Sequence, residues 1–379
     1  MTTPQTRRWV VQLSAAAAAG GCGPSVEKPQ IEHQLSGCAA VPDRLDTGFD
    51  RDALEGCLAQ FVSSETNFHG LTIWRSGTMI AERYRTGRDE TVGRSSEIVS
   101  FDRCRLHDVR SITKSVVSLL WGIADSEGKT PPLDTKVLSL YPELSGLARH
   151  GREEITIRHL LTMSTGLDWN ESNYGALSNP ETALFWRTSQ ARHTFDRPMV
   201  AAPGLRFNYC GGNTAVLADL LVRFTGQTVP NYAEERLFRP LGIHDWAWVN
   251  DYRDRPLAFA GLRLTPRDLL KIGQLVLSDG QFDGRAIIDA AWIEVSTTRH
   301  MATGDGLHYG YQWWLGEVAA RGGLHPYIAG FGNGGQRLFV VPSLALVVAI
   351  TAGNYGRADQ RLSSDMFRAI AATAIPTPV

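Results

Sequence analysis

Ser111 and Lys114 stand three residues apart at the head of an apolar run, "SITKSVVSLLWGIAD", residues 111–125. One helical turn would place both side chains on the same face. A serine hydroxyl needs a base to become a nucleophile, and a lysine amine can be that base where burial removes its charge. One interpretation of the pair is therefore a nucleophile with its base. The alternative is that Ser111 caps the helix and Lys114 is solvated.

Lysine is scarce in this chain, which makes each lysine informative. Only five of the 38 basic residues are lysines, and the rest are arginines that cannot lose their proton in a protein. A Ser-x-x-Lys string is expected by chance roughly 0.3 times at average serine frequency. The second match, Ser126 with Lys129, falls where Gly128 and a double proline end the helical pattern. We expect that second pair to lie in a solvated loop.

Two later segments could complete an acyl-transfer site. Tyr209 lies in a turn just before the helical pattern "TAVLADLLVRFTG", where its phenol could approach a cleft. The run "AGFGNGGQRLFVVP", residues 329–342, places glycines before a strand. Glycines let backbone N–H groups come close to a ligand, as an oxyanion hole requires.

Composition excludes several other classes of function. The chain has 379 residues, 43% hydrophobic content and a net charge of −1, so nothing favours nucleic acid or an anionic membrane surface as a partner. No Gly-x-Ser-x-Gly string is present, which argues against an α/β-hydrolase triad. We expect no metal and no organic cofactor, since the following histidines lack metal-ligand spacing: His107, His159, His244, His300, His308 and His325.

The order of predicted elements indicates an α+β fold. Strand patterns surround a turn at residues 75–77 and return at residues 309–316, 336–342 and 344–351. A helix is predicted from Ile112 to Ala124, and another closes the chain at about Asp359 to Ala371. Helical patterns and long loops fill residues 130–290. We expect one sheet built from both termini, an inserted helical lobe, and a cleft between them. Of Trp313 and Trp314, which alternate on a strand, one should face the core, and the other could line the cleft or lie elsewhere on the surface.

The first residues have the layout of an export signal. Arg7 and Arg8 precede an apolar, alanine-rich segment and then small residues before Cys22. The arginine pair resembles a twin-arginine signal, and Ala19-Gly20-Gly21-Cys22 resembles a lipobox with alanine in place of the usual leucine. We expect a signal over residues 1–22, lipidation at Cys22, a polar tether over 23–44 and a catalytic domain over 45–375. The alternative is a plain secretory signal.

Export would place the other four cysteines in an oxidising compartment. Four cysteines allow three complete pairings, and the sequence does not choose among them. Cys38 could pair with Cys57 or Cys104, whereas we expect Cys210 to be a buried free thiol.

Four motifs in order make residues 60–370 resemble a known family. It comprises the serine hydrolases related to class C β-lactamases, D-alanyl-D-alanine carboxypeptidases, esterases and 6-aminohexanoate-dimer hydrolases. Ser111-Ile112-Thr113-Lys114 resembles the Ser-x-x-Lys motif, and Tyr209-Cys210-Gly211 falls where the family has Tyr-x-Asn. Asn333-Gly334-Gly335 falls where Lys-Thr-Gly or His-x-Gly stands. "TIRHLLTMSTGLDWNE" and "LTPRDLLKIGQLVLSDGQFDG" resemble two further landmarks.

The resemblance implies a β-lactamase/transpeptidase-like fold and a role for each motif residue. Ser111 would attack the acyl carbonyl, Lys114 would take its proton, and Tyr209 would share the base role and later protonate the leaving group. The Ser111 N–H and one from the Gly335–Gln336 edge would hold the oxyanion. A small-molecule acyl substrate is the expected partner, and the oligomeric state stays open.

Two departures from the family pattern bear on the substrate. Gly211 replaces the substrate-binding asparagine, with Asn213 as a possible substitute, and Asn333 replaces a cation suited to a carboxylate-bearing substrate. Both favour an esterase or amidase for an uncharged or amino-terminated acyl compound. The "GLDWNE" loop, with aromatic Trp169 and acidic Asp168 and Glu171, resembles the aminohexanoate-dimer hydrolase branch more than the lactamases. The alternatives are a β-lactamase or D-Ala-D-Ala carboxypeptidase, or a slowly turning-over penicillin-binding or receptor protein.

Overall fold

An eight-stranded antiparallel sheet carries the fold, and both ends of the chain contribute to it. The computed structural model describes residues 40–172, 176 and 178–375. The strand order is β10-β11-β12-β13-β14-β15-β1-β2, so the N-terminal hairpin pairs with the last strand of the chain. The bounds are β1 Phe68–Arg75, β2 Thr78–Tyr84, β10 Met301–Ala302, β11 His308–Tyr309, β12 Trp314–Ala320, β13 Gly323–Gly332, β14 Gln336–Val341 and β15 Leu346–Ala352.

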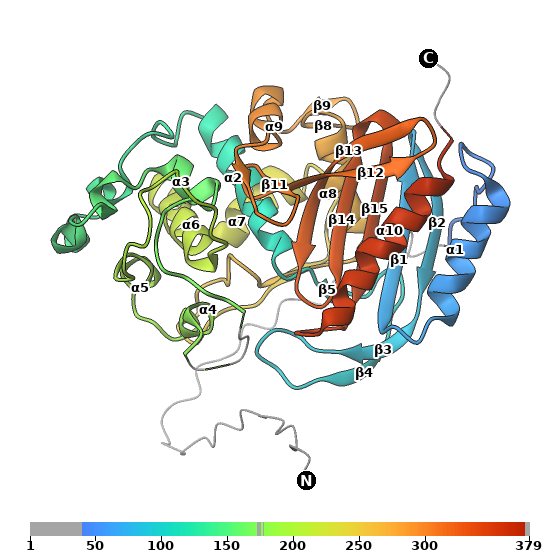
Figure 1. The fold of residues 1–379 in the computed structure, drawn as a ribbon, viewed down its shortest axis with the longest axis horizontal. Coiled ribbons are helices and arrows are strands. Elements are labelled where there is room, and N and C mark those ends of the chain that lie inside the picture. The colour runs from blue at the N-terminus through green and yellow to red at the C-terminus, as the bar shows by residue number, and fades with distance from the viewer. Residues whose placement is uncertain (1–39, 173–175, 177, 376–379) are drawn as a thin grey trace, which may run out of the picture.

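The sheet has helices on both faces because its central strands alternate two apolar sets. In β14, Phe339 and Val341 belong to the core under α1 (Arg51–Ser63) and α10 (Leu362–Thr373). Leu338 and Val340 belong to the larger core shared with α2 (Ile112–Ser126) and α8 (Pro266–Leu277). Successive strand side chains point to opposite faces, so a wholly apolar strand is buried on both sides. Figure 1 shows α1 and α10 lying over one face of the sheet.

A helical lobe lies beside the sheet between β5 and β7 in the chain (Figure 1). It contains α3 Ile157–Leu161, α4 Pro180–Ala183, α5 Gln190–Phe195, α6 Gly211–Thr225 and α7 Val229–Ala233. Short elements link lobe and sheet: β3 Thr86–Asp89, β4 Glu97–Ser100, β5 His107–Asp108, β6 Trp246–Trp248, β7 Leu262–Leu264, β8 Gln281–Phe282, β9 Arg285–Ala286 and α9 Ala290–Ser296.

The α+β architecture predicted from the sequence is confirmed, with one difference in the helical region. The predicted turn at Ser76 and Gly77 joins β1 to β2, and both residues have positive φ, as a tight hairpin requires. The α8 helix, expected in the helical lobe, instead packs on the sheet, where Gly273 lies directly against Val347 and Leu338. Its apolar stripe needs a partner, and the second face of the sheet supplies one.

The predictions for the N-terminus, including Cys22, the export signal and most of the tether, lie outside the described residues. Within the described part of the chain, no helix has the length and apolar character needed to cross a membrane.

Candidate active site

Ser111 stands at the N-terminus of α2, held by a strained residue before it. Arg110 has φ of +50°, a conformation that few non-glycine residues adopt. Its guanidinium lies 3.2 Å from Asp108 Oδ2 and 4.3 Å from the centre of the Tyr355 ring, so several contacts fix the turn. Ser111 occupies the N-cap position, yet its side chain makes no capping hydrogen bond. The hydroxyl is therefore directed to another partner.

That partner is Lys114. Its Nζ donates to Ser111 Oγ at 3.0 Å and to the carbonyl oxygen of Phe259 at 2.8 Å. The lysine side chain is 1% exposed, so the solvated alternative does not describe it. It lies 4.9 Å from the centre of the Tyr209 ring. The i,i+3 spacing on a buried helix places amine and hydroxyl in direct contact.

Tyr209 completes a cluster of three side chains around the hydroxyl. A hydrogen bond links its phenol to Ser111. Burial holds the pKa of the Tyr209 phenol well above its usual range, and the nearby Glu171 carboxyl raises it further, against the opposing effect of Ser111. The phenol is therefore protonated at neutral pH and can donate a proton.

Two buried glutamates lie behind Lys114, and the sequence patterns identify neither as part of the site. Glu181 Oε1, from α4, is 3.5 Å from Lys114 Nζ. Glu171 Oε1 accepts from the backbone N–H of Gly211 at 2.5 Å and from the Trp169 indole at 2.6 Å. Burial, together with the charge of Glu181, raises the pKa of Glu171 to about 8. Burial also raises the pKa of Glu181, but Lys114 opposes that shift.

A pKa of about 8 keeps the Glu171 carboxyl protonated at neutral pH. The glutamate pair also explains Gly211, where the family has asparagine. A Cβ at residue 211 would lie 2.5 Å from Glu181 Oε1 and 3.2 Å from Glu171 Oε1, so the carboxylates occupy the space of a side chain there.

Strand β13 lies against the nucleophile at Gly330 and Gly332. A Cβ on Gly330 would lie 2.9 Å from Ile112 Cγ2, and one on Gly332 would lie 2.5 Å from the carbonyl oxygen of Val109. β13 pairs with β12 only as far as Ala329, which lies opposite Trp314. On its other edge, β13 pairs with β14 as far as Gly332, which lies opposite Gln336. Backbone groups alternate sides along a strand, so the N–H of Phe331 points away from β14.

The predicted oxyanion residues Asn333, Gly334, Gly335 and Gln336 form the turn after β13 and the start of β14. The N–H of Gly335 donates back to Gly332 O at 3.3 Å, and a Cβ there would meet Ser363 of α10. Asn333 Oδ1 accepts from Gly356 N at 2.9 Å. The Gln336 side chain bonds both backbone groups of Ala352. The structure thus brings Gly330 to Gly332, rather than these residues, against the start of α2.

Two further predicted substrate-binding residues are buried in the lobe. Asn213 is 0% exposed, and its Nδ2 faces the sulfur of Met163 at 3.6 Å. Helical geometry turns it away from the space left by the missing asparagine. Trp169 is 3% exposed and supports Glu171 by its indole N–H. Both side chains are therefore buried in the lobe and not exposed at its surface.

Aromatic rings surround Tyr209. The Trp314 ring lies 5.6 Å from the Tyr209 ring and 5.4 Å from that of Phe331. Trp313 is fully buried, whereas Trp314 is partly exposed. Trp313 is the member of the pair that belongs to the core.

The second Ser-x-x-Lys match, Ser126 with Lys129, and the cysteines can also be compared with the expectations from the sequence. Ser126 Oγ bonds Ile123 O, and Lys129 Nζ pairs with Glu127 at 2.6 Å, so the second Ser-x-x-Lys match has no serine–lysine contact. Cys210 is a buried free thiol, as predicted. Cys57 is also free, so a bond from Cys38 to Cys57 is excluded. Cys104 is disulfide-bonded.

Comparison with known proteins now gives the family. The family model described as Beta-lactamase matches residues 67–373. A 6-aminohexanoate-dimer hydrolase from Paenarthrobacter ureafaciens is 26% identical over 312 residues, covering 75% of this chain and 72% of that protein. A D-aminopeptidase from Brucella anthropi is 28% identical over 164 residues, which cover 36% of this chain and 31% of that one.

Solved structures show the same fold. The octameric penicillin-binding protein homologue from Pyrococcus abyssi superposes with a TM-score of 0.65 at 20% identity, covering 84% of this chain and 76% of that one. The chain therefore belongs to the β-lactamase family. Within it, the relatives are serine hydrolases, and this protein is a hydrolase of that class.

Proposed function

We propose that this protein hydrolyses an acyl ester or amide through an acyl-enzyme on Ser111, with Lys114 as base and Tyr209 as proton donor. The observation that carries the proposal is the 3.0 Å contact between a fully buried Lys114 amine and a Ser111 hydroxyl that caps nothing. Contact between the two groups gives the hydroxyl proton a direct path to the amine.

Acylation follows from these contacts. Ser111 Oγ bonds to the acyl carbon as its proton passes to Lys114 Nζ. The resulting ammonium is stabilised by Glu181 and by the Phe259 carbonyl. The negative charge on the former carbonyl oxygen is held by the N–H groups of Ser111 and Phe331, whose neighbours Gly330 and Gly332 contact the nucleophile turn.

The leaving group then takes a proton from Tyr209, whose raised pKa keeps the phenol protonated until that step. The acyl carbon to leaving-group bond breaks, and Lys114 returns a proton to the phenol. Water adds to the acyl-enzyme by the same groups in reverse, releasing the acid and restoring the Ser111 hydroxyl.

An acyl compound without a carboxylate beside the scissile bond is the proposed substrate class. The two basic side chains at the site, Arg110 and Lys114, lie 3.2 Å from Asp108 and 3.5 Å from Glu181, both buried acids. Glu181 adds negative charge where the family has a neutral amide. The names of the two curated relatives, a dimer hydrolase of 6-aminohexanoate and an aminopeptidase, support amide hydrolysis in amino-bearing compounds.

Hydrolysis of a p-nitrophenyl ester panel, an amino-terminated amide and a chromogenic cephalosporin tests the proposal. Turnover of ester and amide should be lost in Ser111→Ala, and fall at least about 100-fold in Lys114→Met. The second Ser-x-x-Lys pair gives matched controls, so Ser126→Ala and Lys129→Met should keep full activity. Cephalosporin turnover would favour a β-lactamase. A stoichiometric burst without turnover would favour a slow penicillin-binding protein.

We also propose export and a lipid anchor at Cys22. The signal-like residues 1–22 support this, as does the disulfide at Cys104, since disulfides persist in oxidising compartments. Metabolic labelling with a fatty acid should mark the wild-type protein and not Cys22→Ser. Retention of the unlabelled protein in the cytoplasm would contradict export.

A further inference from the structure

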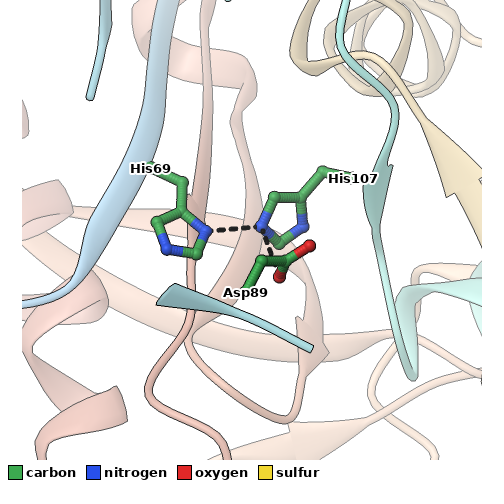
Figure 2. A group of neighbouring side chains, drawn as sticks. All are labelled: His69, Asp89 and His107. Atoms are coloured by element: carbon green, nitrogen blue, oxygen red, sulfur yellow. Dashed lines mark hydrogen bonds and ion pairs between the residues drawn. The ribbon is translucent and has the colours of Figure 1, made fainter. Parts of the chain in front are cut away.

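Two histidines and an aspartate meet in the interior at three different elements. His69 comes from β1, Asp89 ends β3 and His107 begins β5, and Figure 2 shows their side chains pointing toward one another. One ligand-type atom from each lies within 4.8 Å of the others. Both histidines are 0% exposed. The sequence-based expectation of no metal considered His107 by spacing alone and did not connect it with His69 or Asp89.

The outer nitrogen of each imidazole faces an acceptor. His107 Nδ1 lies 2.8 Å from the backbone carbonyl of Asp108, which can only accept. His69 Nε2 lies 3.2 Å from Asn67 Oδ1. The Asn67 amide has a fixed orientation, since its Nδ2 donates to Arg88 O and its Oδ1 accepts from Arg88 N. Both outer nitrogens therefore carry hydrogen.

The inner nitrogens then face each other without a hydrogen between neutral rings. His69 Nδ1 lies 2.8 Å from His107 Nε2, as the dashed line in Figure 2 marks. The contacts to Asp108 O, to Asn67 Oδ1 and between the two rings each need a hydrogen. Two neutral imidazoles carry only two N–H hydrogens. Opposed lone pairs at this distance repel unless a cation lies between them.

We propose that His69 Nδ1, His107 Nε2 and Asp89 Oδ1 bind a divalent transition-metal ion, with Zn²⁺ the best fit to two imidazoles and a carboxylate. Zinc–nitrogen bonds of about 2.0–2.1 Å in tetrahedral geometry put the two nitrogens about 3.3 Å apart, so the rings need to separate by only about half an ångström. Asp89 Oδ1 already lies 3.6 Å from His107 Nε2.

The surroundings have the features of a second coordination shell. Ligating histidines usually donate their other N–H to a carbonyl or carboxylate, and ligating carboxylates are themselves hydrogen-bonded. Asp108 O and Asn67 Oδ1 accept from the rings, and the Tyr355 hydroxyl donates to Asp89 Oδ1 at 2.7 Å. The Phe101 ring stacks on His69 at 4.2 Å and holds its plane.

A path to the site and a consequence of binding both follow from its position. Asp89 lines a cavity of about 680 Å³, so open space reaches the carboxylate side of the cluster. The ion would join β1, β3 and β5, and His107 precedes Ser111 by four residues. The site is therefore structural, bracing the strand that leads into the nucleophile turn.

Zinc binding to the purified full chain, after chelator treatment and dialysis, tests this directly. Equilibrium dialysis with Zn²⁺ alone, followed by elemental analysis, should give one zinc per wild-type chain. Asp89→Asn should weaken affinity about 10- to 100-fold, and His69→Gln should abolish stoichiometric binding. His325→Gln is the matched control because that half-buried histidine lies on β13, outside the cluster, and it should bind as wild type.

The thermal transition supplies a second measurement that does not depend on activity. Zn²⁺ should raise the Tm of wild type and of His325→Gln, and leave that of His69→Gln unchanged, since a ligand that binds only the folded chain stabilises it. A cooperative melt of zinc-free His69→Gln establishes that this variant folds. Absence of zinc binding by wild type, or equal binding by His69→Gln, would overturn the proposal and assign the pair to a shared proton.

Discussion

The carboxyl group of Glu181 lies 3.5 Å from the amine of Lys114, which also contacts Ser111 Oγ at 3.0 Å. Both side chains are buried, so their interaction is screened little by solvent. In the proposed mechanism, Lys114 takes its proton from Ser111, and Glu181 stabilises the ammonium that results. This relationship distinguishes the site from a simple serine–lysine pair.

Glu181→Gln should lower kcat/KM about tenfold or more, because the amide keeps the size of the side chain but removes the charge that stabilises protonated Lys114. The pH–rate profile should change with it, since the lysine would accept its proton less readily. Glu154→Gln is the control, as Glu154 pairs with Lys136 at an exposed position. An unaltered profile with a reduced rate would indicate a packing role instead.

Glu171 should make stability fall as pH rises. Its pKa is about 8 in the folded chain and near 4.5 when unfolded, so between these values the folded state holds a proton that the unfolded state has lost. The contribution is fully present below about pH 4.5 and is lost by pH values above 8. Tm measured from pH 5 to 9 should therefore fall less in Glu171→Gln, whose amide oxygen can still accept from Gly211 and Trp169. Parallel curves for the two proteins would refute the assignment.

Gly211→Asn, which restores the family's residue type, should reduce both stability and activity. The new side chain would displace Glu181 and Glu171 from the space they fill, at a cost of about 1–3 kcal/mol. Gly56→Asn in α1 is a control without neighbours at its Cβ. Denaturant unfolding and ester turnover measure the two effects. A gain of activity in Gly211→Asn would mean that the glutamates are not needed.

Gly332→Ala should lower kcat about tenfold or more with little change in KM. Its methyl group would meet the carbonyl oxygen of Val109 and push β13 away from the nucleophile turn, which weakens the oxyanion contact from Phe331. Asn333→Ala, one residue later in the turn, should keep nearly full activity. Steady-state kinetics with circular dichroism as a check on folding compares them. A larger loss of kcat in Asn333→Ala than in Gly332→Ala would instead assign the oxyanion site to residues 333–336.

Local patterns predicted the elements and the first pair of the site. Helical spacing determines that Ser111 and Lys114 share a face, whatever surrounds them, and alternation in the terminal strands determines a sheet buried on both faces. Residue type alone separated the active pair from Ser126 and Lys129, because a glycine and prolines end the helix there. These inferences depend on neighbours within a turn or a strand.

The sequence could not predict in the same way which residues of the glycine-rich run, 329–342, lie against the nucleophile turn. A strand offers backbone groups at every second residue, and only the register with β12 and β14 shows that the free edge begins at Gly330. Asn333 to Gln336 have the right composition but lie in the turn beyond that edge.

The amino-acid sequence by itself determined a serine–lysine pair on a buried helix, a tyrosine ahead of the next helix, and a sheet closed by both ends of the chain. Tertiary structure alone decided that Glu171 and Glu181 lie behind the lysine, and that His69, Asp89 and His107 face one another. The physical reason is the distance along the chain between the residues that come into contact. Contacts within a few residues follow from backbone geometry, whereas these groups meet across strands and loops whose packing is a property of the whole chain.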